Sequence, residues 1–175
     1  ALLARWVGVE YLGIYSLANA IMLISEVIAK MGLETGIMRF VSRLEPKTEK
    51  FQIQKIIQSS LKMTGIFSIS LAILLASIAW LLVSLFKGTS LLHTAIIVFA
   101  FTIPFNAITL VSAFATQGFK LLKYKVFTTQ IINPMVLLGS MMISYWIFSK
   151  ESAIILPIAV TGVLGSIIML FMLKN

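Results

Sequence analysis

Long apolar runs separated by short basic segments dominate the chain. Three of the runs carry no formal charge and are 24, 24 and 22 residues long, over residues 63–86, 126–149 and 152–173. At 1.5 Å per residue, each forms an α-helix of roughly 33–36 Å, which exceeds a hydrocarbon core of about 30 Å. The pattern therefore predicts three transmembrane helices with these bounds.

A fourth uncharged run, residues 88–119, is 32 residues long and too long for one straight span. We expect a transmembrane helix over residues 92–115, with residues 88–91 and 116–119 in loops or at the membrane interface. The segment 12–38 is interrupted by charged residues, but its length and apolar background predict a fifth span.

The start of the chain indicates a fragment. It begins with Ala1 rather than methionine and lacks the basic start and small-residue cleavage site of a signal peptide. We expect residues 1–7 to be the tail of an earlier helix, followed by a turn over residues 8–13.

The segment 40–62 is the only long connection between the predicted spans. Its apolar residues Phe51, Ile53, Ile57 and Leu61 lie on one side of a helical wheel. Two interpretations stay open: a short amphipathic segment on the cytoplasmic membrane face, or a cytoplasmic extension of the next helix.

Composition and charge strengthen the membrane interpretation. The chain is 59% hydrophobic and 11% charged, against about 45–50% and about 25% in soluble domains, so lipid must cover the excess. The net charge of +8 does not form one patch that would bind nucleic acid. Ten Lys and Arg residues fall on one side of the predicted spans: Arg39, Arg43, Lys47, Lys50, Lys55, Lys62, Lys120, Lys123, Lys125 and Lys174.

The opposite side receives only Arg5, Lys87 and Lys150. By the positive-inside rule, the side with ten basic residues faces the cytoplasm. The sequence thus predicts an all-α, multi-pass helix bundle in the cytoplasmic membrane, with membrane lipids as its surroundings.

A polar stripe marks the segment 12–38. At 100° per residue, Tyr15, Asn19, Glu26, Lys30 and Glu34 fall within an arc of about 100°, along roughly 29 Å of helix. A charge at the bilayer centre costs about 2.5–3.5 kcal/mol on insertion scales, so such a stripe should line a cavity rather than face lipid.

Structural pairing is the competing interpretation of the stripe. Glu26 with Lys30, and Lys30 with Glu34, have the i,i+4 spacing of ion pairs that neutralise each other inside a bundle. Arg39 lies at the cytoplasmic end, where it either anchors the topology by reaching to headgroups or binds a phosphate.

Weaker polar positions accompany prolines in two other spans. Asn106 follows Pro104, and Asn133 precedes Pro134. Prolines bend helices and free backbone carbonyls, and broken helices often flank transporter sites. We therefore expect these four residues to take part in gating or in secondary contacts with a solute.

No catalytic constellation is present in the sequence. The chain has no cysteine or aspartate and one histidine, His93, expected at the outer interface, and it has none of the common hydrolase, zinc or nucleotide motifs. We expect neither catalytic residues nor a metal site nor a bound cofactor.

Two motifs resemble those of a known family. Residues 4–15 read ARWVGVEYLGIY and resemble the end of the first helix and outer turn of polysaccharide flippases. Residues 31–40 read MGLETGIMRF and resemble the glycine-containing end of the second helix of these proteins, with its arginine–aromatic exit. The family belongs to the superfamily of multidrug, oligosaccharidyl-lipid and polysaccharide exporters.

The resemblance implies the N-terminal six-helix lobe of a MATE-like flippase fold, with a second lobe missing from this chain. Its members flip oligosaccharides linked to undecaprenyl or dolichyl pyrophosphate across the membrane by alternating access. It implies that Lys30 and Arg39 contact the pyrophosphate. Glu26 or Glu34 would be a site of H⁺ or Na⁺ coupling, or else a resting counter-ion.

Three alternative functions remain. An ion-coupled multidrug or metabolite antiporter of the same superfamily would use a carboxylate such as Glu26. A membrane-embedded glycosyltransferase or polymerase is disfavoured by the short outer loops. A non-transporting scaffold is disfavoured by the polar stripe.

Overall fold

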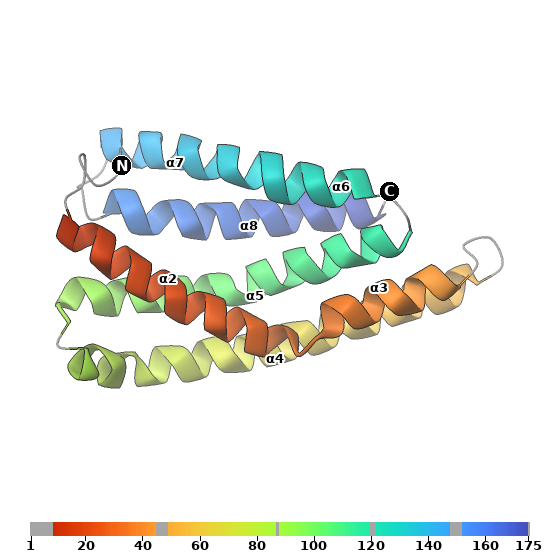
Figure 1. Cartoon of the computed structure of the whole chain (residues 1–175), viewed down its shortest axis with the longest axis horizontal. Helices are drawn as coiled ribbons and strands as arrows, with labels where there is room; N and C mark the ends of the chain where they lie inside the picture. Colours follow the sequence, from red (N-terminus) through yellow and green to blue (C-terminus); the bar gives the residue numbers. More distant parts are fainter. Residues whose placement is uncertain (1–8, 45–48, 87, 120–121, 148–151, 175) are drawn as a thin grey trace.

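The computed structural model of this chain describes residues 9–44, 49–86, 88–119, 122–147 and 152–174. Within these residues every regular element is a helix. In chain order they are α2 (Val9–Lys30), α3 (Leu33–Arg43), α4 (Lys50–Leu85), α5 (Ser90–Gly118), α6 (Leu122–Val126), the π-helix η1 (Phe127–Ile132), α7 (Asn133–Ile147) and α8 (Ser152–Lys174). The long helices run side by side along the longest axis of the molecule (Figure 1).

Four helical segments of the described chain are long and apolar enough to cross a membrane: Gly13–Lys30, Lys50–Leu85, Ser90–Gly118 and Phe127–Ser144. A shorter apolar helix follows at Pro157–Leu173. Large apolar side chains also cover the outside of the bundle, where Trp80 is 74% and Trp146 is 90% exposed. Lipid accounts for such exposure, so the predicted all-α membrane protein is confirmed at this level.

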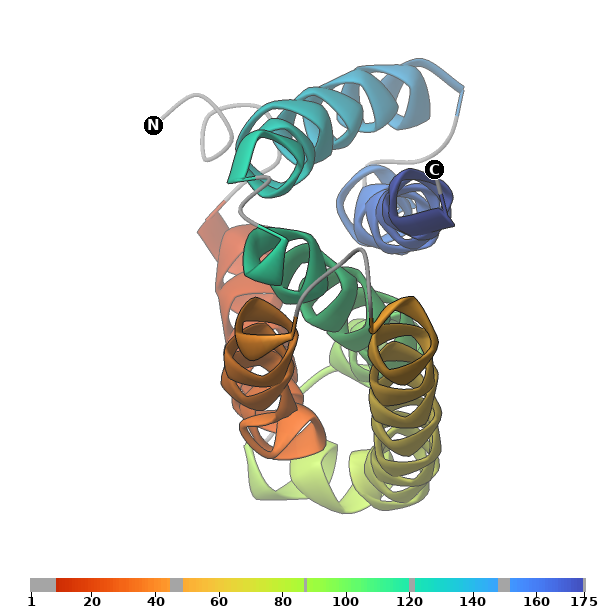
Figure 2. The same cartoon turned by 90° about the vertical axis from the view of Figure 1, so that its right-hand side faces the viewer.

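Helix α5 lies at the centre of the bundle. Viewed along the helices, it separates a group made of α2, α3 and α4 from a group made of α7 and α8 (Figure 2). It contacts α2, α3, α4, α6 and α8. Alanines at 95, 100, 107, 113 and 115 are all buried on it, and such small side chains let neighbouring helices approach closely in a membrane.

Two apolar clusters hold the helices together. The larger one joins α2, α4, α5 and α8 and includes Met22, Leu75, Phe99 and Ile158. The second joins α3 to the start of α4 and the end of α5, and its buried members are Ile37, Val41, Ile53, Ile57, Val111 and Ala115. The second cluster lies at the end of the bundle that the basic residues predict to be cytoplasmic.

A break divides the segment that we expected to be one helix over residues 12–38. Helix α2 ends at Lys30 and α3 begins at Leu33. Between them, Met31 has φ 46° and Gly32 has φ 75°. Both values are left-handed, which glycine adopts freely and which costs another residue roughly 1–2 kcal/mol. The apolar pattern continues across the break, so the pattern alone could not reveal it.

Other boundaries also differ from the expected ones. Residues 9–13, expected as a turn, belong to α2, and residues 116–118, expected outside the span, belong to α5. Residues 40–43 of the segment 40–62 belong to α3, and its residues from Lys50 onward are continuous with the next helix, α4. Its 36 residues extend about 54 Å, well beyond the hydrocarbon core. The predicted helix tail over residues 1–7 lies outside the described residues.

Helix α3 approaches α5 most closely at Gly118. A Cβ atom at this position would lie 2.8 Å from Cβ of Val41 and 3.1 Å from the carbonyl oxygen of Met38. Gly118→Ala should therefore lower the free energy of unfolding by about 1–3 kcal/mol, the usual cost of overpacking. The change is measured by thermal unfolding of the purified protein in detergent. Gly139→Ala is the control, because a Cβ at Gly139 meets nothing within 4 Å; equal stability of the two variants would contradict the close packing.

The break between α2 and α3 depends on the conformation of Gly32. Gly32→Ala should cost about 1–2 kcal/mol of stability, because alanine must adopt the left-handed conformation there. Gly36→Ala provides the control: Gly36 also meets nothing within 4 Å, and its φ is not in the left-handed region. If both substitutions left the unfolding temperature equally unchanged, the helix would not be broken at this position.

Candidate functional site

A cavity of about 300 Å³ lies among α2, α5, η1, α7 and α8. Its volume is at the lower end of the range of about 300–1,000 Å³ found for small-molecule sites. Its lining residues are Tyr15, Asn19, Met22, Leu23, Glu26, Asn106, Thr109, Leu110, Thr129, Asn133, Leu137, Ile158, Thr161 and Gly162. Eight of these carry hydroxyl, amide or carboxyl groups, an unusual concentration among helices that are otherwise apolar.

Helical spacing brings these residues to one place. Tyr15, Asn19 and Glu26 are separated by four and seven residues, which keeps them on one face of α2. The same rule places Asn106 and Thr109 together on α5. The five elements contribute polar groups from different sides, so that the site exists only in the assembled bundle.

The strongest polar contact in the cavity joins α2 to α5. The side-chain amide of Asn106 donates a hydrogen bond of 2.7 Å from Nδ2 to Oε1 of Glu26. Glu26 is only 6% exposed. A hydrogen bond to a carboxylate is roughly twice as strong as one between neutral groups, and it is needed most where water is absent. The bond therefore fixes both the position of Glu26 and the approach of the two helices.

The π-helix η1 positions the opposite wall. π-helical turns are rare and are frequently found at functional sites. Thr129 of η1 and Asn133, the first residue of α7, are four residues apart and both line the cavity. The side-chain oxygen Oδ1 of Asn133 is buried and has no hydrogen-bond partner. A buried acceptor without a partner is costly, and this one lies against Gly165 of α8 rather than against a residue of the lining.

Two glycines of α8 make room for the asparagine side chains. A Cβ atom at Gly162 would lie 3.2 Å from Oδ1 of Asn106, and one at Gly165 would lie 2.9 Å from Oδ1 of Asn133. A larger residue at either position would displace an amide from its present location. The glycines thus shape the cavity without contributing a polar group.

The structure places the predicted site residues in two groups. Tyr15, Asn19 and Glu26 line the cavity, and so do Asn106 and Asn133, which we expected to have secondary roles. Lys30, Glu34 and Arg39 do not line it, and neither do Pro104 and Pro134. The break at residues 31–32 explains part of this division, because the face of α2 does not continue unchanged into α3. The predicted roles of the second group in binding stay predictions.

Three polar lining residues were missed by the sequence reasoning: Thr109, Thr129 and Thr161. Threonine is common in membrane helices, where its hydroxyl satisfies its own backbone. No pattern in the sequence distinguishes these threonines from those that lie elsewhere, and only the packing of α5, η1 and α8 identifies them.

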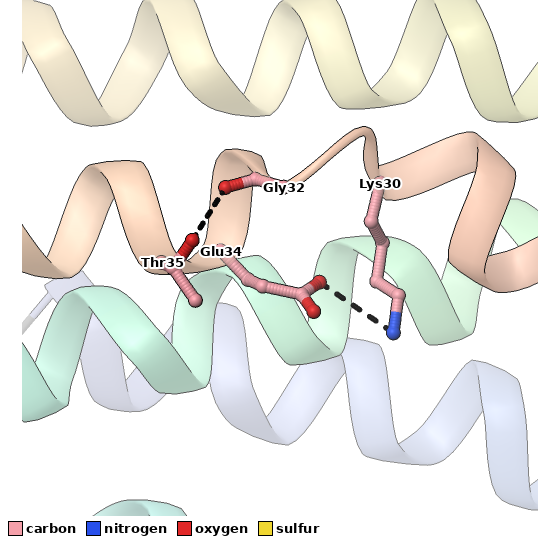
Figure 3. Close-up of polar contacts among 4 residues, drawn as sticks. All are labelled: Lys30, Gly32, Glu34 and Thr35. Atoms are coloured by element: carbon pink, nitrogen blue, oxygen red, sulfur yellow. Dashed lines mark hydrogen bonds and ion pairs between the residues drawn. The ribbon is translucent and has the colours of Figure 1, made fainter.

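Lys30 and Glu34 form an ion pair across the break. Nζ of Lys30 lies 3.5 Å from Oε2 of Glu34, and the two side chains are 12% and 22% exposed. Figure 3 shows the pair spanning the turn, with Oγ1 of Thr35 donating a 3.0 Å hydrogen bond to the carbonyl oxygen of Gly32. The pairing interpretation is therefore confirmed for Lys30 and Glu34, whereas Glu26 contacts Asn106.

A second ammonium group lies near this pair. Lys125 of α6 donates a 2.8 Å hydrogen bond to Oε1 of Gln117 and sits 3.5 Å from the ring centroid of Phe114. Burial lowers the pKa of Lys125, and the negative charge of Glu34 acts in the opposite direction. Arg39, by contrast, is exposed on α3. Lys30 thus pairs directly with Glu34, and the charge of Lys125 interacts with the same carboxylate at longer range.

Metal binding finds no support in the described part of the chain. No group of three or more His, Cys, Asp or Glu side chains comes together there. The cavity itself contains a single carboxylate, that of Glu26, and no basic residue.

Comparison with known proteins does not identify a family. No protein-family model, no curated protein and no solved structure matches this chain. The resemblance of residues 4–15 and 31–40 to polysaccharide flippases therefore remains an expectation from the sequence.

Proposed function

We propose that this chain forms part of a membrane transporter that flips a polyprenyl-pyrophosphate-linked oligosaccharide across the cytoplasmic membrane by alternating access. The observation that carries the proposal is the polar cavity of about 300 Å³ within a bundle of membrane-length helices. The proposed transporter belongs to the biosynthesis of cell-surface polysaccharide and is not an enzyme.

The cost of polar groups in a membrane supports a transport role. Side chains such as Glu26 and Asn133 are expensive to bury at membrane depth, and they usually mark substrate or ion pathways. A scaffold protein could fill the same volume with leucine or alanine at lower cost. The cavity is open enough to hold a solute group, which a purely structural polar contact does not require.

The positive charges of the lysines near Glu34 support the proposal that part of the solute is anionic. Lys30 of α2 pairs with Glu34, and the charge of Lys125 on α6 interacts electrostatically with the same carboxylate. A pyrophosphate arriving at this position could replace the carboxylate as the partner of Lys30, because the phosphate offers more acceptor oxygens and more negative charge. The left-handed turn at Met31 and Gly32 provides a place where α2 and α3 could move relative to each other.

The size of the cavity indicates that further protein completes the route. A lipid-linked oligosaccharide is larger than a cavity at the lower end of the small-molecule range. The proposal therefore includes a second lobe of the same protein facing this bundle. Membrane lipids surround both lobes.

An ion-coupled antiporter of the same superfamily is the second candidate. Glu26 favours it, because a carboxylate that is the only charged group among the described residues lining a cavity is suited to exchanging H⁺ or Na⁺ for a solute. Coupling at Glu26 is also compatible with the flippase, so the two candidates differ in the solute and not in this residue.

Lys30→Ala in the full-length protein tests the flippase. Loss of the ammonium group should reduce export of surface polysaccharide by about tenfold or more, the effect of losing about 1.4 kcal/mol of binding. Export is measured as polysaccharide on the cell surface at equal protein expression. Lys55→Ala is the control, because Lys55 is exposed on α4. Unchanged export in Lys30→Ala would remove this residue from the mechanism.

Glu26→Gln separates the two candidates. Glutamine keeps an oxygen that can accept from Asn106 but cannot carry the negative charge. For an antiporter, ion-driven efflux of organic cations from cells should be present in the wild type and lost in the variant. Absence of such efflux in the wild type, together with normal polysaccharide export, would leave the flippase as the function.

A further inference from the structure

The three threonine hydroxyls that line the cavity all donate their hydrogen to a backbone carbonyl oxygen four residues earlier in the chain. Thr109 donates its hydroxyl hydrogen to the carbonyl oxygen of Phe105 at 2.8 Å. Thr129 and Thr161 do the same toward the carbonyl oxygens of Lys125 and Pro157, at 2.8 Å and 2.6 Å. A hydroxyl has one hydrogen to donate and two lone pairs. Each of the three therefore offers the cavity only an acceptor oxygen.

The amide and carboxyl groups differ in what they offer. Each asparagine brings one acceptor oxygen and two N–H donors, although Oδ1 of Asn133 is buried against Gly165. Nδ2 of Asn106 already donates to Glu26, whose carboxylate retains further acceptor sites. Tyr15 and Asn19 can each donate or accept. Among the described residues the lining thus combines acceptor oxygens of threonine and Glu26 with N–H and O–H donors of the asparagines and Tyr15, and it holds no cationic side chain.

This chemistry selects against phosphate. A phosphate oxygen accepts hydrogen bonds and carries negative charge, so the acceptors would repel it and Glu26 would add a like charge. The side chains of Lys30 and Lys125 do not line the cavity, so neither makes direct contact with an anion held within it. A ligand that enters needs hydrogen-bond donors for the threonine oxygens and Glu26, and acceptors for the amide groups, without a negative charge.

The distribution of the acceptors favours an extended ligand over a single ion. Metal ions bind oxygen ligands that converge to roughly 2–2.6 Å around one point. Here the polar groups extend from Tyr15 to Glu26, about 16 Å along α2, and continue on four other elements. The polar groups are too dispersed to converge on one ion, whereas the separated hydroxyl groups of a sugar ring can contact several of them at once.

We propose that the cavity is a subsite for one uncharged sugar unit, bound through its hydroxyl donors, and that the pyrophosphate is held outside it. This inference rests on the proposed function and divides the substrate between two places. The cavity takes the saccharide, and the lysines near Glu34 take the charged linker. Cavity volume and chemistry together limit the subsite to a single ring.

Binding to the purified full-length protein tests this inference without requiring transport. The protein is placed in lipid nanodiscs, since sugar-based detergents would compete. Saturation-transfer NMR then measures binding of neutral methyl hexosides and methyl N-acetylhexosaminides, with inorganic pyrophosphate and sodium chloride as separate competitors. We expect the wild type to bind at least one neutral glycoside. Neither competitor should displace it.

Two variants remove acceptors without changing shape. The double variant Thr129→Val, Thr161→Val and the single variant Asn133→Leu should each weaken glycoside binding by about tenfold or more, with unfolding temperatures equal to or above that of the wild type. Asn133→Leu is informative even if the double variant is unstable, because Oδ1 of Asn133 has no partner to lose. Thr94→Val is the control: Thr94 also donates to its own helix, at 3.2 Å to Ser90, but it is exposed and does not line the cavity.

The outcomes distinguish this inference from the proposed function. Glycoside binding that persists in Lys30→Ala, while export is lost, supports both. Glycoside binding with export unaffected by Lys30→Ala supports the subsite and contradicts the proposed role of Lys30. Absence of any glycoside signal, displacement by pyrophosphate, or displacement by sodium would overturn the sugar subsite. Unchanged binding in both acceptor variants would overturn it as well.

Discussion

Hydrocarbon supplies no hydrogen-bond partners, and this constraint governs both the backbone and the polar side chains of the protein. Backbone groups are satisfied within helices, which leaves the side chains to find partners or to gather around a cavity. The hydrogen bond from Asn106 to Glu26 shows this constraint most clearly, because it pairs a buried carboxylate with a donor from another helix. Most polar groups of the membrane-length helices near this bond face the same cavity, and the exposed surface is left to apolar side chains such as Trp80.

The central position of α5 follows from its small side chains. Its buried alanines and Gly118 allow α3, α4 and α8 to approach it, and Asn106 lies on the same helix between its two apolar clusters. The break at Met31 and Gly32 lets α2 and α3 each pack on a different part of α5. One straight helix over these residues could not follow both surfaces. The cost of a left-handed methionine is offset by the apolar contacts that α3 makes beyond the break.

The polar groups of the bundle divide into two regions of opposite character. The cavity presents neutral hydroxyl and amide groups with one carboxylate, whereas the ammonium group of Lys30 pairs with Glu34 outside the cavity and Lys125 interacts with the same carboxylate electrostatically. A substrate with a neutral hydroxyl-rich part and an anionic linker matches both regions at once. This match, together with the membrane-length helices, is the physical basis on which we propose a flippase for lipid-linked oligosaccharides.

The sequence by itself determined the helical membrane character of the chain, because long uncharged runs can be stable only as helices in lipid. It also identified Tyr15, Asn19 and Glu26 as one face, since helical periodicity is local. It could not reveal the break at residues 31–32, because the apolar pattern is the same on both sides and only the packing on α5 distinguishes them. Nor could it select Thr129 or Thr161: whether a threonine faces lipid, protein or a cavity depends on which helices lie beside it, and the tertiary structure alone decided that.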